Sequence, residues 1–523
     1  MLIGIDLGQT ACKAVALDPV RGVCATATRG YPTSQPFPGW AEQNPQDWLR
    51  AAASACREVV GAGGGAVTGI AVTGATHNAV LVDGAGVPVR PCMTLRDTRA
   101  GAQAERINRQ LGPELLRRAR NRASAGWTAP QLAWIREHEP EVWARAQGVL
   151  FAKDYVRFWL TGERATDHID AEGSLLLNAD TRSWDPLLCD AVPLDRGWLP
   201  AVRAPSDLAG QVSPQAARGT GLRTGTPVVT GCSDTAAEAL ACGAVAVGQG
   251  IVKLATAGNV NVVGATAMPS VSYFCYSHPV DGLVYHSYGT NAAAASRAWF
   301  HALVGAEAAA DYARLDREAA AVAPGADGVL FQPYLHGERA PVFDSSLRAS
   351  FLGLSGRHGR AHMLRAVLEG VALSLADCAG AAGEAGLHID DLRIIGGGAR
   401  SALWRQIVAD VLGRPLLVPV LADASAGAAL LAGVGTGSFA DPLHAAHERA
   451  GVSGEIIPDA GRAAGYAELL EIYREARSVV APLARRLTEV NYEQRFPAEQ
   501  QQPAVQSARQ PDRRGEAGFS DDG

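Results

Sequence analysis

The first eighteen residues place an acid, a small-residue turn, a hydroxyl and a cation close together. Two apolar runs, residues 2–5 and 14–17, flank the turn that follows Asp6, and this pattern predicts a β-hairpin. Gly8 has no side chain, so backbone N–H groups can approach an anion there, while Thr10 adds a hydroxyl donor and Lys13 a positive charge. The segment favours a nucleotide site with an acid for a metal and a loop for phosphate, although an ordinary hairpin turn accounts for it as well.

A similar pattern returns in the second half of the chain. Residues 250–254 and 260–263 have strand-like composition and flank a turn that contains Thr256 and Gly258. We interpret this segment as a degenerate internal repeat of the first hairpin, so that each half contributes one phosphate-facing loop to a shared cleft. An unrelated hairpin is the alternative.

A third small-residue turn follows a predicted strand at residues 392–395. It contains Gly397, Gly398 and Ala399 and leads into a predicted helix that ends before Gly413. Bare backbone at the start of a helix lets a phosphate or a planar ligand approach closely. Tight strand-to-helix turns also use glycine for packing alone.

The elements that must position these residues alternate between strands and helices, which is typical of an α/β fold. Apolar periodicity predicts strands at 67–72, 79–82 and 227–230, and helices at 130–139, 364–375 and 426–431. The last of these helices has a candidate cap at Asp423 or Ser425. Another helix should begin near Thr235, because Thr235 and Glu238 have the spacing of a capping box.

The composition excludes several classes of partner. The 523-residue chain has a net charge of −6 and no basic stripe, so we expect no nucleic-acid partner. We see no apolar run of bilayer-spanning length, and the chain starts directly with a strand, so we expect no membrane association and no signal segment. The nine cysteines are dispersed singly, which favours free thiols in a reducing cytoplasm and argues against a structural metal site.

Several segments, in order, resemble the FGGY carbohydrate kinases, and xylulokinases most closely. They are Ile3-Gly4-Ile5-Asp6-Leu7-Gly8, Lys153-Asp154-Tyr155, Gly231-Cys232-Ser233-Asp234, Gly337-Glu338-Arg339-Ala340-Pro341, Phe351-Leu352-Gly353-Leu354, Leu368-Glu369-Gly370-Val371 and Gly396-Gly397-Gly398-Ala399-Arg400-Ser401. The resemblance implies a two-domain actin-like ATPase (ribonuclease H-like) α/β fold with an interdomain cleft. We place an N-terminal domain at residues 1–243, a C-terminal domain at 244–490 and a disordered tail at 491–523.

The resemblance also implies transfer of the ATP γ-phosphoryl group to a sugar hydroxyl, a reaction that depends on positioning and charge neutralisation. Asp234 matches the catalytic base, although an Asp at this point could simply cap a helix. Asp6, together with Asp234, matches the acids that hold Mg²⁺. Three small-residue turns match the nucleotide-binding positions: Gly8, Thr10 and Lys13; Thr256 and Gly258; and Gly397, Gly398 and Ala399.

On the sugar side, the resemblance points to a histidine, a hydroxyl pair, an ion pair and an aromatic wall. These are His77, Thr76, Thr235, Asp97, Arg99 and Trp127. Arg99 could equally be a salt-bridge residue. The chain departs from the xylulokinase pattern around Thr76, Arg96 and Thr235, and lost or gained buried hydrogen bonds there change substrate choice strongly.

We therefore expect a kinase for a ketopentose such as D-xylulose, with ribulose and polyols such as erythritol or glycerol as alternatives. A catalytically silent nucleotide-binding regulator and an ATP hydrolase are the competing classes. A homodimer is compatible with the family, but no sequence feature demands one.

Overall fold

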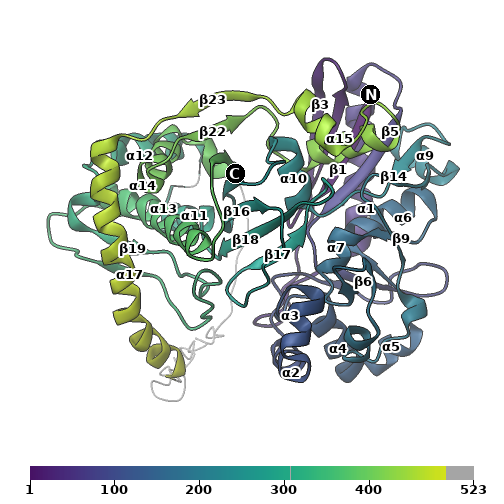
Figure 1. Cartoon of the computed structure of the whole chain (residues 1–523), viewed down its shortest axis with the longest axis horizontal. Coiled ribbons are helices and arrows are strands. Elements are labelled where there is room, and N and C mark those ends of the chain that lie inside the picture. Colours follow the sequence, from purple (N-terminus) through teal and green to yellow (C-terminus); the bar gives the residue numbers. More distant parts are fainter. Residues whose placement is uncertain (307, 491–523) are drawn as a thin grey trace, which may run out of the picture.

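The computed structural model describes residues 1–306 and 308–490 and divides them into two lobes, each built on one large mixed sheet (Figure 1). The predicted disorder of 491–523 lies outside the described residues. The first lobe has a six-stranded sheet in the order β13 (Leu208–Gln211), β14 (Pro227–Val229), β5 (Gly69–Gly74), β1 (Leu2–Leu7), β2 (Ala11–Asp18) and β3 (Gly22–Gly30). Strands β14, β5 and β1 are parallel, whereas β1, β2 and β3 form an antiparallel meander.

The second lobe has a seven-stranded sheet with a related centre. Its order is β17 (Phe274–Ser277), β18 (Val284–Thr290), β16 (Gly258–Gly264), β15 (Gln249–Leu254), β21 (Asp391–Ile395), β22 (Leu416–Pro419) and β23 (Val452–Ile456). Here too an antiparallel hairpin, β15–β16, stands beside a parallel strand, β21. The two hairpins predicted from the sequence are therefore both present, and they occupy matching places in the two sheets.

Helices cover both sheets, as expected for an α/β fold. The helices are α1 (Pro45–Gly63), α2 (Gly101–Leu111), α3 (Pro113–Ala119), α4 (Thr128–His138), α5 (Pro140–Arg145), α6 (Ala152–Thr161), α7 (His168–Glu172), α8 (Pro186–Asp190), α9 (Pro214–Thr220), α10 (Asp234–Cys242), α11 (Ala294–Leu303), α12 (Ala309–Ala320), α13 (Arg360–Glu384), α14 (Ala402–Leu412), α15 (Ala424–Gly435), α16 (Pro442–Arg449) and α17 (Ala460–Glu489). Small two-stranded ladders complete the fold: β4 (Glu42–Gln43) with β7 (Cys92–Met93), β6 (Ala79–Val82) with β8 (Gly148–Phe151), β9 (Ala165–Asp167) with β12 (Ala201–Arg203), β10 (Leu177–Asn178) with β11 (Ser183–Trp184), and β19 (Leu330–Gln332) with β20 (Ser350–Leu352).

Helix α15 belongs to the second half of the sequence but packs on the sheet of the first lobe (Figure 1). It lies so close to β1 that a Cβ atom on Gly4 would stand 1.8 Å from the carbonyl oxygen of Ser425. It also crosses α10, where a Cβ atom on Gly427 would stand 1.9 Å from the carbonyl oxygen of Ala237. Glycine is required at both contacts because any side chain would overlap backbone atoms of the neighbouring element.

Two details differ from what the sequence predicts. The capping box does not form: Ser233 is the N-cap of α10, Asp234 is its first residue, and Glu238 instead binds Lys253. Helix α13 is long and apolar enough to cross a bilayer, contrary to the expectation that no segment is, but most of it is buried in the core of the second lobe. Its apolar length is explained by this buried position.

The predicted free thiols are confirmed. None of the nine cysteines is paired, and all except Cys24 are buried. They act as small apolar side chains of the core.

The contact between α10 and α15 yields a stability prediction. We expect Gly427→Ala to lower the free energy of unfolding by about 2–3 kcal/mol, because the added methyl group overlaps the Ala237 backbone and forces the two helices apart. The matched control is Gly383→Ala on α13, where a Cβ atom meets nothing within 4 Å, so this variant should be unchanged or about 0.5–1 kcal/mol more stable. Urea denaturation of both variants is the measurement, and equal stability of the two would contradict the close contact.

Candidate functional site

The parallel strands of each sheet end at one edge, and the predicted site residues follow those ends. In the first lobe, β1 ends just after Asp6, β5 leads into the loop with His77, and β14 leads into Asp234. In the second lobe, β15 leads into the loop with Thr256, and the parallel strand β21 leads into Gly397. Loops at the carboxyl ends of parallel strands are the usual place for ligand binding in α/β proteins.

Four carboxylates and two lysines gather where α10 and α15 begin. Lys13 Nζ on β2 lies 2.7 Å from Asp423 Oδ2, at the N-cap of α15. Lys253 Nζ on β15 lies 2.6 Å from Glu238 Oε2, one turn into α10. Asp6 and Asp234 complete this cluster, which we call the acid–lysine cluster. It joins both hairpins to the two crossing helices.

The acids of the cluster influence one another through a low-dielectric environment. Burial, followed by the charges of Asp234 and Glu238, raises the pKa of Asp6 well above its usual value. Burial also raises the pKa of Glu238 to about 6, although Lys253 opposes that rise. One oxygen of Asp6, Oδ1, is enclosed and has no hydrogen-bond partner among the described residues. An enclosed acid oxygen without a partner, surrounded by further acids, is a favourable place for a cation.

The three small-residue turns differ in how open they are. Thr10 and Thr256 have exposed side chains, and the loop of Thr256 is fixed by backbone bonds of 3.0 and 3.1 Å from Ala293 and Ala295 to the Thr256 carbonyl. The Gly8 N–H is already engaged, since it donates to the Ala11 carbonyl at 3.0 Å. The open loops are therefore available to a ligand mainly through hydroxyl groups and the remaining backbone.

In the third turn, the absence of a side chain has a different explanation at Gly397 than at Gly398. Gly397 is exposed and a Cβ atom there would meet nothing within 4 Å. Gly398 is buried, and a Cβ atom there would stand 2.7 Å from the Trp404 ring and 2.9 Å from Leu254. Packing thus explains Gly398, while Gly397, followed by the half-buried Ala399, presents bare backbone to the surroundings.

His77 is held by four neighbours in a strained backbone position. Its φ angle is 74°, and the Thr128 hydroxyl donates to its carbonyl at 2.8 Å. Nδ1 lies 2.6 Å from the Gly173 carbonyl, which requires a proton on Nδ1 and leaves Nε2 to accept from the Tyr276 hydroxyl at 3.3 Å. The ring stacks on Trp127 with centroids 3.9 Å apart. A left-handed non-glycine residue fixed in this way is typical of a functional site.

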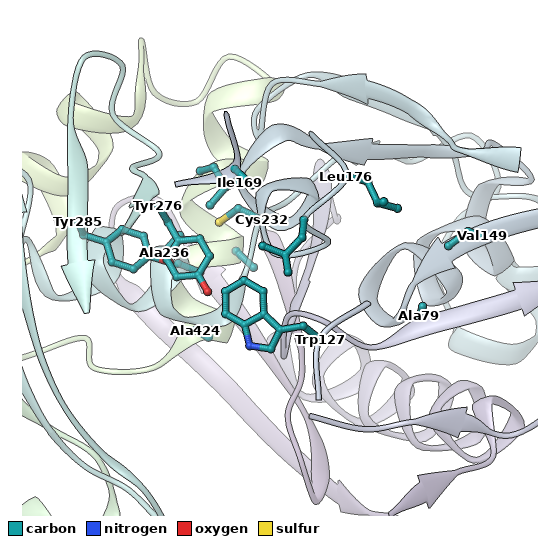
Figure 2. Close-up of a cluster of buried hydrophobic side chains, with 14 of the residues drawn as sticks. Ala79, Trp127, Val149, Ile169, Leu176, Cys232, Ala236, Tyr276, Tyr285 and Ala424 are labelled. Carbon is teal, nitrogen blue, oxygen red and sulfur yellow. The ribbon is translucent and has the colours of Figure 1, made fainter. Parts of the chain in front are cut away.

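Tyr276 comes from the second lobe, so His77 lies at the junction of the two lobes. Figure 2 shows the rings of Trp127, Tyr276 and Tyr285 gathered near Cys232 and Ala236. Tyr276 lies on the edge strand β17, and the residues directly before and after it are hydrogen-bonded to the first lobe. The Asn121 side chain exchanges hydrogen bonds of 2.8 and 2.9 Å with the Cys275 backbone, and Glu172 accepts from the Ser277 N–H and hydroxyl.

Asp97 and Arg99, predicted to lie near a sugar, form a buried ion pair with each other. Arg99 Nε and Nη2 donate to the two Asp97 oxygens at 2.9 and 2.6 Å, and Arg99 also lies 2.8 Å from Glu42. The guanidinium stacks 3.3 Å from the Trp40 ring centre. These bonds match the salt-bridge alternative for Arg99. The other two predicted sugar residues, Thr76 and Thr235, are half-buried, and Thr235 donates to Asp234 Oδ1.

Several cluster members were not singled out as site residues by sequence reasoning. The sequence predicts Glu238 and Asp423 only as helix-capping residues and Lys253 only as part of a strand. It gives no signal for Tyr276, which lies outside this cluster. Arg339, from the Gly-Glu-Arg-Ala-Pro segment, acts electrostatically on both His77 and Tyr276 and lines a shallow hollow with Phe274 and Gly289. The sequence feature that could have identified them is a charged residue within an otherwise apolar strand or helix, as at Lys253.

Comparison with known proteins agrees with this geometry. The N-terminal domain model of the FGGY family of carbohydrate kinases matches residues 1–241, and its C-terminal domain model matches residues 256–436. The chain belongs to the FGGY family of carbohydrate kinases. It is therefore a sugar kinase with ATP as phosphoryl donor, built on the two-domain actin-like ATPase fold.

Individual relatives cover nearly the whole of this FGGY kinase. A xylulose kinase from Lactococcus lactis is 32% identical across 94% of this chain and 99% of its own. A gluconokinase from Bacillus subtilis is 28% identical, with 90% and 94% covered. The crystal structure of xylulose kinase from Rhodospirillum rubrum has a TM-score of 0.84 and 30% identity, and it covers 93% of this chain and 100% of that one.

The buried state of His77 in this FGGY kinase predicts a pH effect on stability. Burial lowers the pKa of His77 from 6.5 to about 4, so the unfolded chain takes up the proton first as the pH falls. The stability that this histidine contributes is complete above pH 6.5 and is lost as the pH falls toward 4, by up to about 3 kcal/mol.

Urea denaturation between pH 4.5 and 7.5 measures this effect. We expect His77→Gln to flatten the pH dependence, with a residual slope from His278 and His286, because burial also lowers the pKa of each of these to about 4. His388→Gln, at an exposed site, is the control. An unchanged slope in His77→Gln would contradict the buried neutral state.

Proposed function

We propose that this FGGY kinase phosphorylates a ketopentose such as D-xylulose, with Asp234 as the catalytic base. The observation that carries the proposal is the position of Asp234 at the first turn of α10, between the two hairpins and beside Asp6. A sugar hydroxyl is a poor nucleophile near pH 7, so a carboxylate must accept its proton while the bond to phosphorus forms.

The surroundings of Asp234 suit this role. Thr235 donates to Asp234 Oδ1 from its backbone at 2.7 Å and from its hydroxyl at 3.3 Å. These bonds orient the carboxylate and, within the described part of the chain, leave Oδ2 without a hydrogen bond. Asp234 is half-buried, so a substrate hydroxyl can reach it while the lobes limit access of water, which otherwise competes as phosphoryl acceptor.

Asp6 and Asp234 would hold a Mg²⁺ ion. The enclosed, unpartnered Oδ1 of Asp6 fits this assignment. Mg²⁺ prefers one or two carboxylates together with water and phosphate oxygens, so two acids are enough to hold it. When bound, the ion would offset negative charge on the phosphates.

The nucleotide would lie across the three open turns. Thr10 and Lys13 in the first hairpin and Thr256 in the second would contact phosphates, with Gly8 and Gly258 keeping the turns narrow. The exposed backbone of Gly397, with Gly398 and Ala399, would contact adenine and ribose. Their shared position at the carboxyl ends of β1, β15 and β21 supports this assignment.

The sugar would lie on the side of His77, Trp127 and Thr76, against Tyr276 of the other lobe. The xylulose kinases at 32% identity support a ketopentose, and the related gluconokinase makes a sugar acid the second candidate. Residues 1–243 and 244–490 would form the two domains that approach one another around the substrates, with α15 as the segment that returns to the first.

A panel of acceptors in a coupled ADP-release assay tests the substrate. We expect D-xylulose to give the highest kcat/KM among D-xylulose, D-ribulose, L-ribulose, gluconate, erythritol and glycerol. Preference for gluconate would overturn the ketopentose assignment. ATP binding without turnover of any acceptor would favour a regulator, and ADP release without an acceptor would favour an ATP hydrolase.

Substitution of the base tests the mechanism. We expect Asp234→Asn to lower kcat by roughly two to four orders of magnitude, because the amide cannot accept the hydroxyl proton, with little change in ATP affinity. The matched control is Asp441→Asn, which alters an N-cap aspartate that accepts from His444 N–H at the start of α16. Near-normal kcat in Asp234→Asn, or an equal loss in both variants, would reduce Asp234 to a helix-terminal residue.

A further inference from the structure

Lysine is rare in this chain and always paired with acids. Among 47 lysines and arginines, the lysines are Lys13, Lys153 and Lys253. Lys153 is buried and lies 2.6 Å from Asp154 and 2.8 Å from Asp167. The other two belong to the acid–lysine cluster. The chain uses arginine at almost every other basic position but a compact ammonium at these three, and ammonium and guanidinium groups are not interchangeable in short, single-point contacts.

The Lys13 and Lys253 pairs are built alike. Each lysine lies on a strand of the hairpin that carries an open turn, and each partner acid lies on the first turns of a crossing helix. Lys253 is the second-last residue of β15, directly before the turn with Thr256. Its side chain is 16% exposed and that of Glu238 is 12% exposed. The ion pair is thus largely enclosed but open on one side.

The pair lies near the proposed base, because Glu238 follows Asp234 by four residues, one turn along the same face of α10. The charges acting on Lys253 are, after Glu238, those of Asp234 and Asp6, and they keep the pKa of its ammonium above the usual value although burial opposes this. Lys253 therefore stays protonated beside the base and beside the acid that would hold the metal. Its only hydrogen-bond partner within the described residues is Glu238, which leaves two of its three N–H donors for a ligand.

We propose that Lys253 is a catalytic residue that binds the transferring phosphoryl group, and that Glu238 is its counter-ion when no triphosphate is bound. This inference rests on the proposed phosphoryl transfer. During the step, the bond from phosphorus to the β-phosphate oxygen breaks, the bond to the sugar oxygen forms, and the hydroxyl proton passes to Asp234. Lys253 donates hydrogen bonds to oxygens of the moving group throughout and gives up no proton, so its effect is electrostatic.

Nucleotide binding, measured in the absence of a sugar, distinguishes phosphate binding by Lys253 from a purely structural role. The full-length protein is titrated with ADP and with a non-hydrolysable ATP analogue, both with Mg²⁺. We expect Lys253→Met to weaken binding of the analogue roughly ten- to a hundredfold, the usual effect of losing a charge-assisted hydrogen bond, and to leave ADP binding within about twofold. Independently, kcat with the best acceptor should fall at least as much as analogue affinity, since charge on the group is redistributed in the transition state.

The Glu238→Gln variant distinguishes the effect of losing Lys253 from the effect of losing the ion pair. This variant keeps Lys253, so analogue binding should stay within a few-fold of the unchanged protein. The control for loss of a cation is Arg182→Met, which breaks an exposed ion pair with Asp281 and should alter neither ligand. Thermal unfolding of each variant confirms folding.

Three results would overturn the proposal: equal losses for ADP and analogue in Lys253→Met, no loss for either, or a loss in Glu238→Gln as large as in Lys253→Met. Because these titrations use nucleotide alone, they remain informative if the acceptor panel finds no sugar substrate. Failure of the panel and failure of the lysine assignment are therefore distinct results.

Discussion

The close crossing of α10 and α15 is the constraint on which the site depends. The helices come from different halves of the chain, and they approach closely because Gly427 leaves room for the Ala237 backbone. Gly4 allows the same closeness between α15 and β1. As a result, the first turns of both helices, with Asp234 and Asp423, begin beside the strand that carries Asp6. A side chain at either glycine would move the acids apart before it touched any of them.

This crossing also concentrates charge of one sign. Asp6, Asp234, Glu238 and Asp423 stand against Lys13 and Lys253, so the cluster carries an excess of acids. Burial of Asp6, and after it the charges of Asp234 and Glu238, raise the pKa of Asp6 well above its usual value. Such an arrangement lowers the stability of the empty protein and favours a bound cation. The two lysines pair with Asp423 and Glu238, which leaves the carboxylates of Asp6 and Asp234 for ligands. The same excess of acids that destabilises the empty protein therefore favours binding of a cation.

The sequence predicted the local elements well because their signals are local. Both hairpins, the helix after Gly231 and the glycine turn at 396–398 follow from periodicity and turn residues. The cap predicted at Asp423 or Ser425 is confirmed at Asp423, but the sequence gives no sign that Asp423 also binds Lys13. Glu238 was wrongly predicted as part of a capping box, because acids near helix starts are usually caps. The pairing of β17 with Asn121 and Glu172 joins residues more than a hundred positions apart, and no sequence period encodes it. Family resemblance, rather than pattern, supplied the roles of His77 and the assignment of Asp234 as a base.

The two sides of the proposed site differ in burial and hydrogen bonding, and this difference affects how each substrate enters. On the proposed sugar side, His77, Trp127 and Tyr276 are buried, and β17 is tied to the first lobe by hydrogen bonds of Asn121 and Glu172. On the proposed nucleotide side, Thr10, Thr256 and Gly397 are exposed. Motion that separates β17 from the first lobe must break these enclosed polar contacts, whereas a ligand reaches the exposed turns without breaking them. On the proposed assignment of the site, a nucleotide enters with little rearrangement, while the acceptor replaces the His77–Tyr276 contact with hydrogen bonds of its own. A sugar whose hydroxyls match those two groups then recovers what is lost.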